Sequence, residues 1–279
     1  MRVRFFGVRG SVATPGPSTV RYGGNTVCVE VRLADDTCII LDGGTGIREL
    51  GKALIAEGYR KPMHLFITHS HWDHIIGLPF FGPVYSKDAN VLIHATTERS
   101  VARVRNPIMF DSVHFPVSFS QLPAKIERVE ELGAHHIGSA TVTHIELNHP
   151  GGALGYRIED ADGTSMCYLT DNELSPPGAP TTSIDELARF SAGTDLLIHD
   201  AQYLPDDLPA KHGWGHSIVD QVLALAKSAE ARRLALHHHD PERDDDALDA
   251  IGASTAGWAR EHAKDLHTVV AREGLELDL

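Results

Sequence analysis

The sequence has few cysteines, no long apolar run and no signal peptide. Its three cysteines, Cys28, Cys38 and Cys167, lie in apolar stretches without Cys-x-x-Cys spacing, which predicts buried free thiols rather than disulfides or zinc ligands. No apolar run approaches membrane-spanning length, and the N-terminus lacks the charged-then-apolar order of a signal peptide. We therefore expect a cytoplasmic protein that does not associate with a membrane.

The sequence also lacks an excess of positive charge. Its formal net charge is −13, which disfavours broad, non-specific binding to a phosphate backbone because such binding needs a basic surface. A small phosphate ester is not excluded. Two divalent ions would bring about four positive charges to one spot and reverse the local field.

No linker divides the 279 residues, so we expect a single domain over residues 1–279. The fold class predicted is α+β, with a pair of mixed β-sheets packed together and helices outside, because strict alternation of strands and helices does not appear. Strands are predicted at 3–6, 26–32, 38–42, 64–68, 90–94, 140–146, 154–159, 165–170, 196–199 and 233–237. Helices are predicted at 46–57, 97–105, 182–189, 217–229 and 244–273.

The most informative segment directly follows the predicted strand 64–68. It reads His69-Ser70-His71-Trp72-Asp73-His74, with four potential metal ligands in six positions. The turn after a strand can direct His69 and His71 at one ion while Asp73 and His74 reach a second. The segment therefore predicts a hydrolase site with two metal ions.

A two-metal site needs further ligands, and the downstream sequence offers candidates where predicted strands end. His149 lies in a loop just beyond the strand 140–146, and Asp171 directly follows the strand 165–170. A carboxylate such as Asp171 can bridge two ions with its two oxygens, which a neutral imidazole cannot do. One residue of the triplet His237-His238-His239 is expected to complete the second site.

Together these motifs resemble the metallo-β-lactamase superfamily, and the resemblance spans nearly the whole chain, from Gly23-Gly24-Asn25-Thr26 to Asp240-Pro241. It implies a four-layer αβ/βα sandwich with the site along one edge between the sheets. In the related phosphodiesterases a His-x-x-Pro run begins two residues after a leucine, which favours His238 over His239, with His237 third. The resemblance assigns His69, His71 and His149 to one ion, Asp73, His74 and His238 to the other, and Asp171 to both as a bridge.

Three further residues match positions of the family. Asp42, in an Asp-x-Gly turn after a strand, is expected to orient a ligand histidine. His216 in Gly215-His216-Ser217, with the upstream acid Asp200, is similar to the pair that faces the scissile phosphate in the branch containing RNase Z and the phosphoribosyl cyclic phosphate phosphodiesterases. His216 would stabilise or protonate the leaving group, whereas Asp73 could orient the nucleophile as well as bind metal. Capping of the following helix, or packing of His216 against Trp214, remains the structural alternative.

The expected function is hydrolysis of small phosphodiesters, such as cyclic nucleotides or cyclic ribose phosphates, by a metal-bound hydroxide. The alternative on the same fold is hydrolysis of a carbonyl substrate, namely a lactone, thioester or β-lactam. No basic insertion between Asp171 and Asp200 resembles the tRNA-gripping arm of RNase Z, so no extended nucleic acid is expected as a partner. Zinc is the expected metal, with manganese or iron as alternatives, and a homodimer is the expected assembly.

Overall fold

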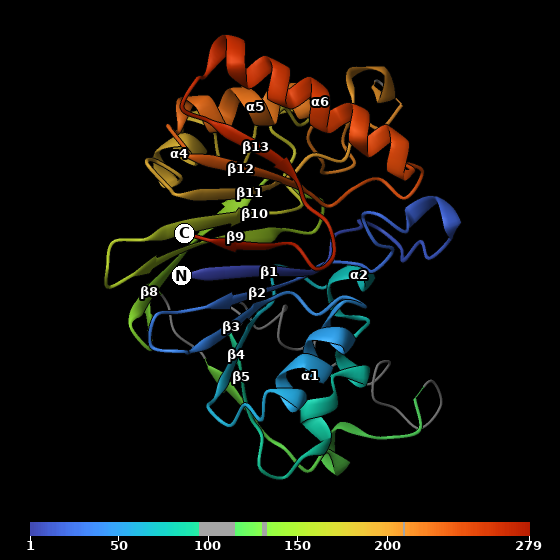
Figure 1. The fold of residues 1–279 in the computed structure, drawn as a ribbon, viewed down its shortest axis with the longest axis vertical. Coiled ribbons are helices and arrows are strands. Elements are labelled where there is room, and N and C mark those ends of the chain that lie inside the picture. The colour runs from blue at the N-terminus through green and yellow to red at the C-terminus, as the bar shows by residue number, and fades with distance from the viewer. Residues whose placement is uncertain (95–114, 130–132, 209) are drawn as a thin grey trace.

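The computed structural model describes residues 1–279 except 95–114, 130–132 and 209. The described residues form two seven-stranded sheets stacked face to face, with helices on their outer faces (Figure 1). This arrangement confirms the predicted αβ/βα sandwich of two mixed sheets. No helix among these residues is long and apolar enough to cross a membrane.

The first sheet contains the N-terminal strands and the last strand of the chain. Its order is β14-β1-β2-β3-β4-β5-β6, antiparallel from β14 to β3 and parallel from β3 to β6. The strands are β1 (Arg2–Gly7), β2 (Cys28–Arg32), β3 (Cys38–Leu41), β4 (Met63–Phe66), β5 (Asn90–His94), β6 (Lys125–Val129) and β14 (Glu276–Asp278).

The second sheet is built from the second half of the chain. Its order is β13-β12-β11-β10-β9-β8-β7, parallel from β13 to β10 and antiparallel from β10 to β7. The strands are β7 (His135–Ile137), β8 (Ala140–Leu147), β9 (Ala153–Asp160), β10 (Ser165–Leu169), β11 (Leu196–Asp200), β12 (Arg233–His237) and β13 (His267–Val270).

Helices cover the two outer faces. Helix α1 (Ile47–Ala56) lies against the first sheet, whereas α4 (Ile184–Phe190), α5 (Val219–Ser228) and α6 (Asp245–His262) lie on the side of the second (Figure 1). In α1 the apolar positions 47, 50 and 54 recur at helical spacing and pack with Ile40 and Leu65 of the sheet. Central strands such as β3 are therefore buried on both faces, which explains their continuous apolar sequence.

A single apolar core fills the space between the two sheets. It contains Phe5, Ile39 and Phe66 of the first sheet together with Tyr156 and Tyr168 of the second. Because both sheets contribute to this core, we propose that residues 1–279 fold as one domain. The three cysteines are buried and free, as their positions in apolar strands predicted.

Some predicted elements differ from those observed. The helix predicted at 244–273 is wrong in its last third, because α6 ends at His262 and residues 267–270 form β13 beside β12. The pairing partner of β13 is remote in sequence, and periodicity cannot detect it. The short strands β6, β7 and β14 were also not predicted. The helix predicted at 97–105 lies outside the described residues.

The topology brings several strand ends to one edge of the molecule. The neighbouring parallel strands β3 and β4, and likewise β10, β11 and β12, point their carboxyl ends the same way. Ligands commonly bind outside the carboxyl ends of parallel strands. Asp42, His69, Asp171, Asp200 and His238 all lie at or just beyond these ends.

Candidate metal centre

The loop after β4 contributes four polar side chains to this edge. Thr68 and His69 follow the end of β4 (Met63–Phe66), and the four-residue helix α2 (Trp72–Ile75) then contains Asp73 and His74, both buried. His69 and His71 belong to one group of candidate donor atoms, whereas Asp73 and His74 belong to another.

A first donor group consists of His69, His71, His149 and Asp171, whose ligand atoms all lie within 4.8 Å of one another. Nε2 of His149 is 3.0 Å from Nδ1 of His71. Oδ2 of Asp171 is 3.5 Å from Nε2 of both His69 and His149. Residues from three separate loops thus converge on one point.

A second donor group consists of Asp73, His74, Asp171 and His238, again with ligand atoms within 4.8 Å. Nε2 of His238 lies 3.1 Å from Oδ2 of Asp73 and 3.0 Å from Oδ1 of Asp171. Nε2 of His74 lies 3.2 Å from the same Oδ1. Asp171 therefore presents one oxygen to each group, as a bridging carboxylate must.

The donor atoms of both groups fit divalent cations. Nε2 of His69 and Nε2 of His74 are buried and have no hydrogen-bond partner among the described residues. Native proteins rarely leave such buried polar atoms unpaired, so each of these two nitrogens is a candidate metal ligand. Imidazole nitrogens mixed with carboxylate oxygens are the donor set that zinc and similar divalent ions bind.

The electrostatics of the two groups differ. Burial lowers the pKa of His69 and of His149, so both imidazoles are neutral near pH 7 and can offer a lone pair. Burial also opposes protonation of His238, but the charges of Asp171 and Asp73 outweigh it and raise the pKa of His238 to about 10. The two carboxylates thus favour a positive charge at the point between them, as expected where a cation binds.

Three of the five donor histidines are oriented through their other ring nitrogen. Nδ1 of His74 is 2.8 Å from Oδ2 of Asp42, and Nδ1 of His149 is 3.0 Å from the carbonyl oxygen of Gly215. Nδ1 of His238 is 2.9 Å from Oε1 of Gln202. Such partners select the ring tautomer that leaves Nε2 for a metal.

Asp42 occupies the orienting position predicted from its Asp-x-Gly turn. Its two oxygens also accept hydrogen bonds from the backbone nitrogen of Thr68, at 2.8 Å, and from the hydroxyl of Tyr168, at 3.2 Å. The carboxylate therefore connects the end of β4 and the strand β10 to the ring of His74. A change at this position should act on metal affinity rather than on chemistry.

We expect Asp42→Asn to weaken metal binding by about 10- to 100-fold, because the amide cannot accept from His74 and the backbone of Thr68 in the same way. Asparagine tolerates the positive φ of 62° at this position, so the backbone should keep its conformation. The affinity would be measured by competition with a chelator. Asp162→Asn, in the exposed β9–β10 turn, is the matched control, and equal affinities of the two variants would contradict the orienting role.

The structure distinguishes the three consecutive histidines after Leu236. His238 lies in the second donor group with φ of 57°. In contrast, Nε2 of His237 is 3.1 Å from the carbonyl oxygen of Gly7, and Nε2 of His239 is 2.8 Å from that of Ala271. The two flanking histidines thus contact backbone away from the site.

His216 lies beside the second donor group. Its Nδ1 is 2.8 Å from Oδ2 of the buried Asp200, and its ring stacks on His238 with centroids 4.9 Å apart. Helix α5 begins after Ile218 without a side-chain cap, and Trp214 is 61% exposed. Among the described residues, His216 thus neither caps α5 nor packs its ring on Trp214; it lies between Asp200 and the donor cluster.

Backbone strain is concentrated at this site. Asp42, Asp171 and His238 have φ between 57° and 62°, the left-handed region that costs non-glycine residues about 1–3 kcal/mol each. Asp42 and His238 directly follow strands, Asp171 comes two residues after β10, and all three are buried. The surrounding contacts therefore hold unfavourable conformations that direct these side chains toward the donor cluster.

Sequence reasoning missed several residues that support the site. The backbone nitrogen of Ser11 donates to Oδ2 of Asp73 at 2.7 Å, and Gln202 and Gly215 orient two histidines. Ser11 is remote from the motifs along the chain, whereas Gln202 and Gly215 are close to Asp200 and His216 in sequence but remote from the histidines that they orient. No local pattern marks them, because their role depends only on which atoms the fold brings within reach.

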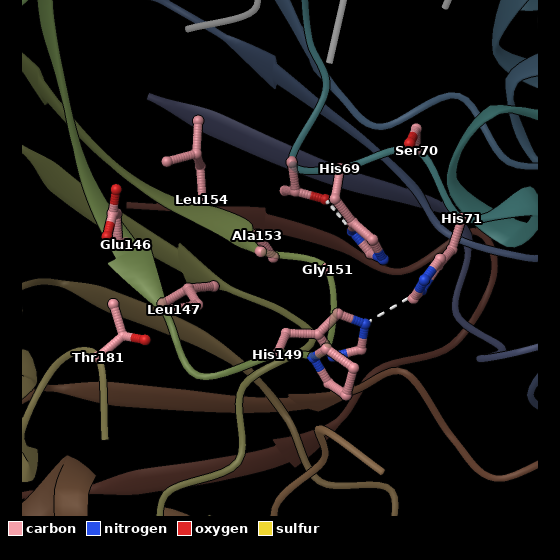
Figure 2. A pocket seen from close by; sticks show the side chains of 13 residues that line it. His69, Ser70, His71, Glu146, Leu147, His149, Gly151, Ala153, Leu154 and Thr181 are labelled. Carbon is pink, nitrogen blue, oxygen red and sulfur yellow. Dashed lines mark hydrogen bonds between the residues drawn. The ribbon is translucent and has the colours of Figure 1, made fainter. Parts of the chain in front are cut away.

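A cavity of about 340 Å³ opens beside the first donor group. Figure 2 shows the rings of His69, His71 and His149 turned toward one another at one end. The wall on the other side is mixed apolar and polar, which suits an organic group larger than a phosphate alone. It includes Glu146, Leu147, Ala153, Leu154 and Thr181.

The layered sandwich, with paired donor groups at the edge between its sheets, defines a metal-dependent hydrolase. Residues 37–239 match the family model described as "Beta-lactamase superfamily domain". The chain therefore belongs to the metallo-β-lactamase superfamily, and its relatives place it in the RNase Z-like branch.

Curated relatives and solved structures agree on this assignment. The chain is 24% identical to ribonuclease Z of Thermoplasma acidophilum, with 89% of each chain covered. It is 25% identical to ribonuclease Z of Bacillus subtilis, over 67% of this chain and 73% of the relative. Two structures have a similar fold: the metallo-beta-lactamase fold protein YhfI of Bacillus subtilis (TM-score 0.69, 20% identity, 99% and 98% covered) and the short form of human tRNase Z (TM-score 0.66, 18% identity, 100% and 99% covered).

These comparisons correct one prediction. The exclusion of an extended nucleic acid as a partner is wrong, because the relatives are ribonucleases by name and one structural neighbour is a tRNase. The exclusion rested on the net charge of −13 and on the missing basic insertion. Net charge describes the whole surface, whereas bound cations would set the field at the site itself.

Proposed function

We propose that this protein is a binuclear metal-dependent phosphodiesterase whose substrates include small phosphodiesters such as cyclic nucleotides or cyclic ribose phosphates. The single observation that carries the proposal is the Asp200–His216 pair beside the second donor group. A phosphodiester needs a group that stabilises or protonates its leaving alkoxide. A carbonyl hydrolase on this fold has no standing need for such a pair.

In this proposal each donor group holds one divalent ion, and Asp171 is the shared ligand. Zinc suits the histidine-rich donor set best, and manganese or iron would use the same atoms. The ions would supply Lewis acidity and lower the pKa of a water molecule. The proposed ligands are His69, His71, His149 and Asp171 for the first ion, and Asp73, His74, Asp171 and His238 for the second.

The chain's own residues would perform the remaining steps. Asp200 accepts from Nδ1 of His216 and from the backbone nitrogen of Ser217, at 2.8 and 2.9 Å, so it holds the ring in one orientation. Nε2 of His216 is then the atom that would pass a proton to the leaving oxygen. Asp73 accepts from the backbone of Ser11 and would orient the attacking water in addition to binding metal.

The comparisons support a phosphoester as the substrate class. Besides the ribonuclease Z relatives, a structure described as a new diphosphatase from the PhnP family aligns with 100% of this chain and 97% of its own, at a TM-score of 0.68 and 19% identity. The cavity of about 340 Å³ beside His149 has room for a nucleoside-sized group.

The decisive experiment is hydrolysis of bis(p-nitrophenyl) phosphate by the purified protein, with bound metal quantified in the same sample. We expect about two ions per chain, turnover with zinc or manganese, and loss of turnover when a chelator removes the ions. Restoring the metal should restore the rate. Two bound ions without cleavage of any diester would refute the phosphodiesterase and direct the search to lactones and thioesters.

A further inference from the structure

Glu173 is a buried carboxylate that neither donor group uses. It lies two residues after Asp171, and its side chain is only 6% exposed. Its Oε1 accepts a hydrogen bond from the backbone nitrogen of Gly213 at 2.8 Å, and its Oε2 accepts from that of Gly215 at 2.9 Å. Burying a charge costs free energy, and hydrogen bonds from backbone N–H groups to a carboxylate are strong. The carboxylate therefore holds the two backbone donors in place.

The segment that Glu173 holds touches both halves of the site. The carbonyl oxygen of Gly215 lies 3.0 Å from Nδ1 of His149, a member of the first donor group. The next residue is His216, whose ring lies against Asp200 and His238 near the second donor group. Gly215, which contacts the proposed metal ligand His149, is thus directly followed by His216, the proposed general acid.

The contact between this segment and His149 depends on glycine. Gly215 has a φ of 90°, and a Cβ atom there would lie 2.2 Å from Nδ1 of His149. Gly213 also has a positive φ, of 86°. Two glycines within three residues make the segment intrinsically adaptable. An external contact is therefore needed to hold it in one conformation.

The ring tautomer of His149 follows from this arrangement. A carbonyl oxygen only accepts hydrogen bonds, so Nδ1 of His149 must carry the proton when it bonds to Gly215. Nε2 is then left with a lone pair directed at His71 and Asp171. Displacement of the Gly215 carbonyl would remove this selection and release the ring.

We propose that Glu173 is a positioning residue that couples the two halves of the site: by clamping Gly213 and Gly215 it sets both the tautomer of His149 and the placement of His216. The proposal rests on the proposed function for the roles of those two histidines. Both oxygens of the carboxylate are used, so an amide of the same size cannot replace it. The amino group of glutamine would face one of the two backbone N–H groups.

The experiment compares Glu173→Gln with Glu159→Gln, a control whose side chain is 56% exposed on β9. Both variants are loaded with cobalt(II), and the affinity of each ion is measured by competition with a chelator. We expect E173Q to bind one of its two ions about 10- to 100-fold more weakly, the usual effect of losing a partner that orients a ligand. The other ion should stay, and E159Q should match the wild type.

Kinetics at saturating metal, with a phosphodiester whose alkoxide is a poor leaving group, give the second measurement. We expect kcat of E173Q to fall about tenfold or more with little change in KM, because saturating metal refills both sites but leaves His216 displaced. Glu173→Asp, which keeps the charge but shortens the reach, should fall between E173Q and the wild type.

Several outcomes would overturn the proposal. Two ions bound by E173Q as tightly as by the wild type would show that Glu173 does not set the orientation of His149. Loss of both ions together with a fall in the thermal unfolding temperature would assign Glu173 to general stability. The cobalt measurement does not require turnover, so it tests the role of Glu173 by itself. Absence of phosphodiesterase activity would refute the proposed function and leave this measurement valid.

Discussion

Asp171→Ala is expected to lose both metal ions and all measurable hydrolysis at once. Oδ2 of Asp171 faces the first donor group, and Oδ1 lies 3.0 Å from Nε2 of His238 and 3.2 Å from that of His74. Without this carboxylate the first donor group keeps only histidines, the second keeps Asp73 as its one carboxylate, and both ions lose their shared ligand. Metal content and the rate of diester hydrolysis would be measured on the same sample.

The backbone at Asp171 requires a second variant. Its φ is 60°, a region that alanine adopts only with strain, whereas asparagine tolerates it. Asp171→Asn removes the charge and one bridging oxygen without that strain, and it should also lose metal and activity. Asp162→Ala in the exposed β9–β10 turn should keep both ions. Full metal content in either Asp171 variant would contradict the bridging role.

His216→Ala is expected to separate metal binding from catalysis. His216 lies with Asp171, Asp200 and His238 in a third group of close polar atoms, but neither of the two groups that we assign to the ions contains it, so both ions should remain. The rate with a poor leaving group should fall by about 10²-fold or more, the usual contribution of a general acid. The rate with a p-nitrophenolate leaving group should fall less, because this anion departs without a proton.

The comparison between the two leaving groups distinguishes loss of a proton donor from a general loss of structure. A general loss of structure would lower both rates equally, whereas loss of a proton donor lowers the rate with the poor leaving group more. His136→Ala, at an exposed position on the edge strand β7, provides a histidine control that should behave as the wild type. Equal rates for H216A and the wild type would assign His216 a structural role.

Local sequence predicted which candidate donor residues lie together at one edge of the fold. The segment His69–His74 follows a buried strand, and its spacing alone indicated that two residues serve each ion. His149 and Asp171 were also proposed as donors, because each lies just beyond an apolar strand pattern. Strand ends can be recognised from a few neighbouring residues, so the donors attached to them can be recognised too.

Local sequence predicted structure less well where a segment contacts residues that are remote along the chain. The helical pattern of residues 244–273 continued through 267–270, which instead pair with β12 as the strand β13. In the same way, neighbouring residues alone left the choice within His237-His238-His239 open. The choice depends on contacts with Gly7, Gln202 and Ala271, which lie elsewhere in the chain.

The sequence by itself determined the fold class and the positions of the candidate donor residues at strand ends, because these depend on strand patterns and short spacings. Only the tertiary structure decided how each ring is oriented. The carboxylate of Asp42, the carbonyl of Gly215 and the amide of Gln202 reach His74, His149 and His238 from remote loops. A hydrogen bond between distant residues depends on folded distances of about 3 Å, and sequence spacing does not encode those distances.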